Sequence, residues 1–152
     1  MKKILVVLGL VVSTVSFGQK KTTLNYAVGA QTLISTKSND ISNGVVARVV
    51  IGEGDTKAVF SVGAAQLLNA SNSTACQFPL LAGLSAKLTN KVSFGVSAGW
   101  SFFNVEGSKA RFTYSPSITL DAGKFDFDIK HVGTLFNGGD LNQVGVGVMY
   151  KF

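Results

Sequence analysis

The sequence predicts an all-β protein, an eight-stranded antiparallel up-and-down transmembrane β-barrel, from three observations. The chain of 152 residues is 46% hydrophobic and only 14% charged, whereas soluble domains carry about a quarter charged residues. Its apolar residues recur at every second position, which is the period of a β-strand. No apolar run reaches the roughly 18 residues that a spanning helix needs, so the chain can enter a membrane only as a closed barrel.

Residues 1–18 are predicted to be a secretory signal peptide. Lys2 and Lys3 precede the apolar run from Ile4 to Val12, and Ser16-Phe17-Gly18 supplies small residues at a cleavage site before Gln19. A short transmembrane anchor is the alternative, but the apolar run is too short to span. The barrel domain is then residues 19–152. Its basic residues are scattered singly and form no basic cluster in the sequence, so they do not indicate nucleic-acid binding.

Eight segments alternate between apolar residues and small or polar residues. The clearest begins at Val92, where every second residue to Phe102 is apolar and the residues between are Ser or Gly. The eight apolar series run, in order, over Tyr26–Thr32, Val45–Ile51, Phe60–Ala64, Phe78–Leu88, Val92–Phe102, Phe112–Leu120, Phe125–Ile129 and Val144–Phe152.

The second face of these strands favours a membrane barrel over a soluble sheet. A soluble sheet shows long charged side chains to water, whereas this face is mostly Ser, Gly, Thr and Ala, which fit the crowded interior of a small barrel. The charged residues on this face are of both signs, as a polar network inside a lumen requires. The predicted network comprises Arg48, Lys87, Arg111, Asp126, Asp128 and Lys130.

Aromatic residues gather toward the two ends of the predicted strands, which indicates two interfacial girdles. One end of the fifth and sixth strands carries Trp100, Phe102, Phe112 and Tyr114. The girdle residues at the opposite end are Tyr26, Phe94, Phe125, Phe127, Tyr150 and Phe152.

The connections between strands alternate in length. A two-residue hairpin at Ala122-Gly123 would set Leu120 opposite Phe125, and the links at 52–57 and 89–91 are also tight. Longer polar connections are expected at about 35–43, 68–77, 103–110 and 132–142. Tight turns that alternate with longer loops, with both termini on the turn side, are typical of outer-membrane barrels.

The chain ends on Phe152, with Tyr150 and Val148 at the alternate positions before it. This ending resembles the C-terminal signal by which bacterial outer-membrane barrels are recognised for assembly. The chain from residue 19 resembles the small eight-stranded outer-membrane barrels, such as the OmpX type and the membrane domain of OmpA, and Gln19 after the signal site resembles the Bacteroidetes version. The resemblance implies an outer-membrane location, and as partners lipopolysaccharide, phospholipid and the barrel assembly machinery; it names no ligand.

The sequence offers little catalytic chemistry. The single cysteine, Cys76, excludes a disulfide framework and a cysteine-based metal cluster. His131 is the only imidazole and is expected on the outer face opposite Tyr114, where lipid A deacylases carry a catalytic His in a His-x-Ser arrangement; this chain reads His131-Val132-Gly133. Asp126 and Asp128 are expected to pair with cations across the barrel rather than to act as an acid and a base.

Three functional hypotheses follow from these observations. The leading one is a non-enzymatic integral outer-membrane barrel with a filled lumen and short external loops, which has a structural role in the envelope or serves as an accessory subunit of a larger envelope complex. This hypothesis includes no catalytic residue, cofactor or metal site. One alternative is a lipid A-modifying barrel enzyme that uses His131. The other is a secreted soluble β-barrel that binds a small apolar ligand.

Overall fold

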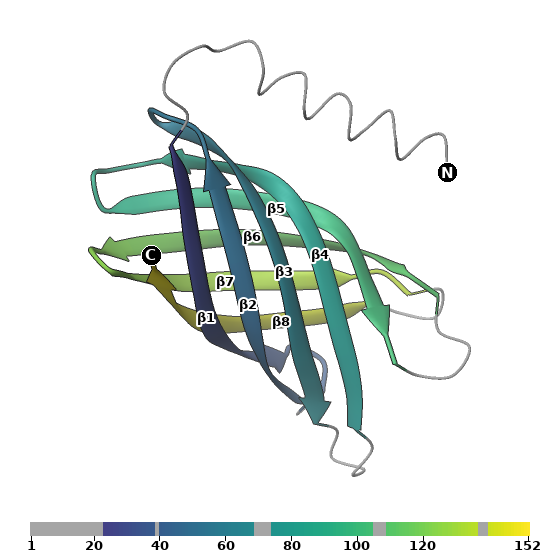
Figure 1. Ribbon diagram of the computed structural model, residues 1–152. Coiled ribbons are helices and arrows are strands. Elements are labelled where there is room, and N and C mark those ends of the chain that lie inside the picture. Colours follow the sequence, from purple (N-terminus) through teal and green to yellow (C-terminus); the bar gives the residue numbers. More distant parts are fainter. Residues whose placement is uncertain (1–22, 39, 69–73, 105–108, 137–139) are drawn as a thin grey trace, which may run out of the picture.

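The computed structural model describes residues 23–38, 40–68, 74–104, 109–136 and 140–152, which form one closed barrel of antiparallel strands joined in sequence order (Figure 1). Residues 1–18, predicted to be a signal peptide, lie outside the described residues. Within the described ranges no helix has the length and hydropathy to cross a membrane. The predicted fold class is confirmed.

Each of the eight predicted strands is present, although Leu88 and Phe152, the last residues of two apolar series, lie just beyond the ends of their strands. The strands are β1 (Leu24–Ser35), β2 (Ile41–Ile51), β3 (Thr56–Leu68), β4 (Thr74–Lys87), β5 (Val92–Phe103), β6 (Arg111–Ala122), β7 (Phe125–Thr134) and β8 (Leu141–Lys151). β1 pairs with β8, from Ala27 opposite Lys151 to Ser35 opposite Gln143, and this pairing closes the barrel. Closure leaves no unpaired strand edge.

The two ends of the barrel differ. The tight links β2–β3, β4–β5 and β6–β7 lie at the same end as the first residue of β1 and the last residue of β8, and we call this the turn end (Figure 1). The loop end carries the other four connections. These are shorter than predicted because the hydrogen-bonded ladders continue: Ile34 pairs with Ile41, and Ala65 pairs with Gln77.

The predicted register of the β6–β7 hairpin is wrong by two residues. Leu120 lies opposite Phe127 instead of Phe125, and Ala122 lies opposite Phe125, so the turn is Gly123-Lys124. Gly123 adopts a φ of 79°, which glycine reaches without strain. The Gly123 N–H also donates a hydrogen bond of 2.9 Å to Asp121 Oδ1. A shift of two residues keeps every side chain on its predicted face. Across the tight β2–β3 link, Ile51 lies directly opposite Ala58.

Alternation along the strands separates a buried lumen from an exposed apolar exterior. On β8, for example, Met149 is only 1% exposed, whereas its neighbours Val148 and Tyr150 are 43% and 37% exposed. The lumen is more apolar than predicted, because Leu33, Val46, Leu81 and Val132 also point inward and are buried. The outer surface is dominated by exposed Val, Ile, Leu and aromatic side chains.

Candidate functional site

The lumen gathers the charged residues of the strands, and its central feature is an ion-pair cluster between β2 and β7. Arg48 reaches from β2 to two carboxylates of β7. Its guanidinium forms salt bridges of 2.5 Å with Asp126 and 3.1 Å with Asp128. The three side chains are only 12%, 10% and 5% exposed. One guanidinium therefore bridges two nearly buried carboxylates, and all three groups are held inside the barrel.

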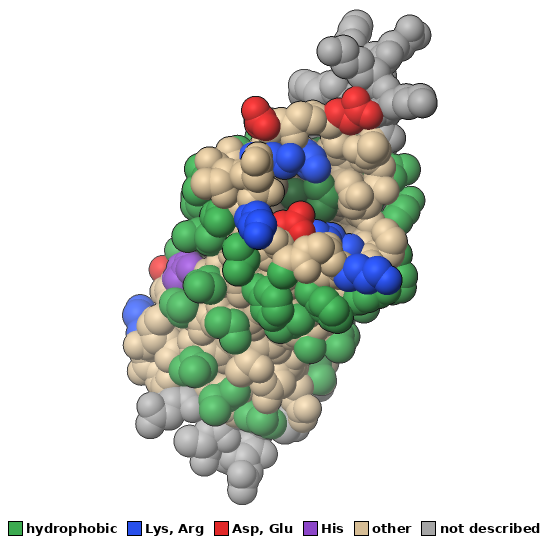
Figure 2. All heavy atoms as spheres, turned by 90° about the vertical axis from the view of Figure 1, so that its left-hand side faces the viewer, with side chains coloured by type: hydrophobic (Ala, Val, Ile, Leu, Met, Phe, Trp, Pro, Cys, Tyr) green, Lys and Arg blue, Asp and Glu red, His purple; other side chains and the backbone are tan. Residues whose placement is uncertain are grey.

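Residues of β6 and β8 extend this cluster toward the turn end. Lys151 Nζ forms salt bridges of 2.8 Å with Asp126 and 2.7 Å with Asp121. Thr119 Oγ1 donates a hydrogen bond of 2.7 Å to Asp128. Figure 2, which faces the side that carries the turn end, shows basic and acidic side chains gathered around a hollow above a hydrophobic surface. The hollow corresponds to a cavity of about 170 Å³.

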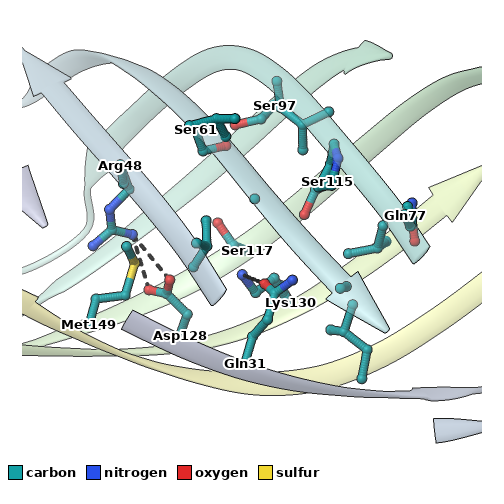
Figure 3. A pocket seen from close by; sticks show the side chains of 18 residues that line it. Gln31, Arg48, Ser61, Gln77, Ser97, Ser115, Ser117, Asp128, Lys130 and Met149 are labelled. Atoms are coloured by element: carbon teal, nitrogen blue, oxygen red, sulfur yellow. Dashed lines mark hydrogen bonds and ion pairs between the residues drawn. The ribbon is translucent and has the colours of Figure 1, made fainter. Parts of the chain in front are cut away.

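A second cavity of about 70 Å³ lies deeper in the lumen (Figure 3). Its polar lining includes Lys130, whose Nζ donates a hydrogen bond of 2.6 Å to Gln31 Oε1. Other polar residues in its lining are Gln77, Asp128 and four serines, Ser61, Ser97, Ser115 and Ser117. Arg48 lines both cavities, so its guanidinium lies at the boundary between them.

Hydroxyl and amide groups form a separate cluster in the lumen at the loop end, which sequence reasoning did not predict. Gln77 Nε2 donates to Ser101 Oγ at 2.9 Å, and Thr113 Oγ1 donates to the same oxygen at 2.7 Å. Thr113 Oγ1 also lies 3.0 Å from Thr134 Oγ1. All four side chains are buried. In the sequence these four residues are marked only by their positions: each falls on an inward-facing position near the loop end of its strand, among β4 to β7.

The structure does not bring every residue of the predicted polar network into these clusters. Lys87 lies at the turn end, lines the outer cavity and forms no salt bridge with any residue in the described ranges. Arg111 lies at the loop end, where its guanidinium stacks 5.3 Å from the Phe136 ring centroid. Phe136 in turn packs against Phe103 at 5.3 Å, so Arg111 belongs to an aromatic cluster instead.

The predicted girdle residues lie on the outer face. Trp100 is directly opposite Phe112 near the loop end. Phe125 packs edge-on against Tyr150 at 5.5 Å near the turn end. The other predicted girdle residues with exposed side chains are Tyr26, Phe94, Phe102, Phe127 and Phe152, and Tyr114 is half-buried.

His131 lies on the outer face, and its ring packs 5.7 Å from the ring of Tyr114. No hydrogen bond or ion pair joins the His131 imidazole to any residue within the described ranges. A His base needs an orienting partner and a nucleophile within hydrogen-bond reach, and the arrangement around His131 supplies neither from the described part of the chain. That part also holds no group of three His, Cys, Asp or Glu residues that could bind a metal ion.

No family model matches the chain. No curated protein sequence matches it either. Solved structures do match. The outer membrane protein Ail of Yersinia pestis, in a phospholipid bilayer nanodisc, aligns at a TM-score of 0.63 and 11% identity over 86% of this chain and 100% of Ail. A de novo designed transmembrane β-barrel aligns at 0.60 and 16% identity, over 84% of this chain and 95% of the design. Neisserial surface protein A aligns at 0.53 and 9% identity, over 88% and 100%. At these identities the likeness shows a shared fold.

Proposed function

We propose that this chain is an integral outer-membrane β-barrel without enzymatic activity, which contributes to envelope structure or serves as an accessory subunit of a larger envelope complex. One observation carries the proposal: the barrel places its apolar residues outward and its charged residues inward. Leu80, Leu84 and Ile129 are each more than half exposed, while Asp128 is 4% exposed. A soluble barrel would need the opposite arrangement.

The lumen supports a structural role rather than transport. Eight strands enclose only enough room for side chains to fill. Arg48, Asp126 and Asp128 cross the lumen, and the hydroxyl and amide cluster around Thr113 fills it nearer the loop end. The cavity of about 70 Å³ between them accommodates a few water molecules, not a solute pathway.

Export and assembly form part of the proposal. Residues 1–18 act as a cleaved signal peptide and residues 19–152 form the barrel domain, as in a Bacteroidetes outer-membrane protein. Val148 and Tyr150 on the outer face of β8 and Phe152 just after the strand are all exposed, and these three residues are the proposed contact with the barrel assembly machinery. Lipopolysaccharide and phospholipid would contact the apolar band. His131, packed on Tyr114, fits an interfacial role better than the lipid A-modifying one.

The proposal is tested by refolding residues 19–152 from urea into detergent micelles and phosphatidylcholine vesicles. We expect unboiled protein to migrate differently from boiled protein on a denaturing gel, and the refolded protein to float with the vesicles. A monomer that folds in water without detergent and stays in solution when vesicles are floated would overturn the membrane assignment and favour the soluble ligand-binding barrel.

A further inference from the structure

A row of uncharged polar side chains crosses the outer face of β1, β2 and β3. Thr32 lies directly opposite Asn43, and Asn43 lies directly opposite Gln66. All three side chains are exposed. Thr32 Oγ1 donates a hydrogen bond of 2.8 Å to Asn43 Oδ1. These strands lie side by side on the near wall of the barrel in Figure 1. We call Thr32, Asn43 and Gln66 the polar row.

The polar row does not mark the edge of the apolar surface, because apolar residues flank it on both sides. The next outward positions toward the loop end are Ile34, Ile41 and Leu68, which are 54%, 42% and 42% exposed. Toward the turn end the next outward positions are Ala30, Val45 and Ala64. Polar groups that face hydrocarbon without partners are costly, since lipid tails offer no hydrogen bonds. The side chains of the polar row therefore need a partner within the membrane that can form hydrogen bonds with them.

The hydrogen-bonding capacity of the row is largely unused. An amide has one acceptor oxygen and two N–H donors. The hydrogen bond from Thr32 occupies the Asn43 oxygen and leaves the Asn43 Nδ2 donors available. No hydrogen bond joins the Gln66 side chain to any residue that the structure describes, so its oxygen is available as an acceptor. An available donor on Asn43 and an available acceptor on Gln66 thus lie on neighbouring strands of the same outer face.

The surrounding face is uncharged. Two of the outward residues that flank the row toward the turn end, Ala30 and Ala64, are small, and the outward positions of β1 to β3 hold no Lys, Arg, Asp or Glu. The large aromatic residues of the loop-end girdle, such as Trp100 and Phe112, lie on β5 and β6 instead. Small residues let two membrane surfaces approach closely. The lack of a basic side chain disfavours the phosphate of a lipid headgroup as the occupant.

We propose that the outer face of β1 to β3 is a dimer interface between two copies of this chain. In a two-fold symmetric contact, Asn43 Nδ2 of one copy donates to the side-chain oxygen of Gln66 of the partner subunit, and the reciprocal bond forms by symmetry. The choice of a second copy rests on this self-complementarity: one surface supplies both the donor and the acceptor that the other requires. The inference rests on the proposed function, because the exposed polar side chains of the row are energetically unfavourable only when they face a membrane.

The test measures energy transfer between copies labelled at a site that faces water. Cys76, the only cysteine, is replaced by Ser, and Glu53→Cys in the exposed β2–β3 turn carries donor or acceptor dye. Labelled copies are mixed in phosphatidylcholine vesicles over a range of protein-to-lipid ratios. We expect energy transfer between donor and acceptor dyes above the level that randomly distributed copies would give. The double variant Asn43→Leu/Gln66→Leu raises the apparent dissociation constant about tenfold or more, the scale of two interchain hydrogen bonds in a membrane.

Two matched variants locate the interface. Val45→Trp places a bulky ring at the centre of the proposed face and abolishes transfer, whereas Val96→Trp on the outer face of β5 leaves it unchanged. Heat-dependent gel migration of every variant verifies that the barrel has folded. A folded, vesicle-bound barrel with only random-proximity transfer overturns the dimer and leaves the proposed function standing. Energy transfer that is unchanged in Asn43→Leu/Gln66→Leu also overturns the dimer interface. So does an equal loss of energy transfer in Val96→Trp and Val45→Trp. A chain that never associates with vesicles removes the proposed function itself.

Discussion

The Arg48 guanidinium on β2 and the Asp126 carboxylate on β7 meet across the lumen, although β1 and β8 separate their strands in the barrel wall. The contact therefore ties together parts of the wall that share no backbone hydrogen bonds. Asp128 on β7 joins the same guanidinium at 3.1 Å. Because the three groups are nearly buried, each depends on the others for the interactions that water would otherwise supply.

Arg48→Leu is expected to destabilise the barrel strongly. The substitution leaves Asp128 without a salt bridge and Asp126 with only the one to Lys151. Loss of one partner from a buried ion pair costs about 3–5 kcal/mol. The free energy of unfolding, measured by urea titration of the barrel in phospholipid vesicles, should fall by this amount.

Two controls separate the ion pair from general damage to the barrel. Lys87→Leu removes a charge that is exposed at the turn end, and it should change the free energy of unfolding by less than about 0.5 kcal/mol. The triple variant Arg48→Leu/Asp126→Leu/Asp128→Leu removes every charge of the cluster and should cost less than Arg48→Leu alone. Equal losses in Arg48→Leu and Lys87→Leu would contradict a special role of the cluster.

Gly133→Ala is expected to destabilise the pairing of β6 with β7. Gly133 lies directly opposite Tyr114, and a Cβ at this position would overlap the Tyr114 ring. Overpacking of this kind typically costs about 1–3 kcal/mol. The loss should be largely relieved in the double variant Gly133→Ala/Tyr114→Ala, so a double-mutant cycle should show strong coupling.

Gly147→Ala provides the matched control for this prediction. Gly147 also lies in a strand, but a Cβ there would meet its nearest neighbours at 3.4 Å or more, which is ordinary contact. Urea titration should therefore show a smaller loss than for Gly133→Ala. Additive effects of Gly133→Ala and Tyr114→Ala would show that the ring does not limit position 133.

Alternation along single strands was enough to predict which face each residue of β5 or β8 presents, because inward and outward positions follow directly from a period of two. Register was harder. A turn at Ala122-Gly123 and one at Gly123-Lys124 both keep Leu120 outward, so the alternation cannot distinguish them; the pairing of Ala122 with Phe125 in the structure does.

The partners within the lumen were not predictable, because contacts across a barrel depend on the stagger of all eight strands. The sequence indicated that Arg48 and Asp126 share the inward face, but not that they meet. Lys87 and Arg111 also fall on inward-facing positions, yet they lie at opposite ends of the barrel. Thr113 and Ser101 carry no charge, and in the sequence they look like the other small residues that fill the lumen. Their hydrogen bond could therefore not be predicted.

His131→Ala is expected to leave the action of the protein on lipid A unchanged. The imidazole packs on the Tyr114 ring, and no described residue supplies it with an orienting partner. Purified barrel incubated with lipopolysaccharide should release no fatty acid above background, with or without His131. His131→Phe should retain stability, whereas His131→Ala should lose about 0.5–1.5 kcal/mol, the contribution of an aromatic pair. Fatty-acid release that requires His131 would revive the lipid A-modifying alternative.

The filled lumen predicts that the barrel does not conduct ions stably. The Arg48–Asp126 and Arg48–Asp128 salt bridges obstruct the lumen between the two cavities, and the hydrogen bonds of Thr113 with Ser101 and Thr134 link β5, β6 and β7 nearer the loop end. An ion entering the turn end would have to displace buried charges that are already paired, which is unfavourable in a medium of low dielectric constant. Planar bilayers with the refolded protein should therefore show no stable steps of current. Long-lived openings of uniform size in the unmodified chain would contradict a filled lumen and require a different function for the ion-pair cluster.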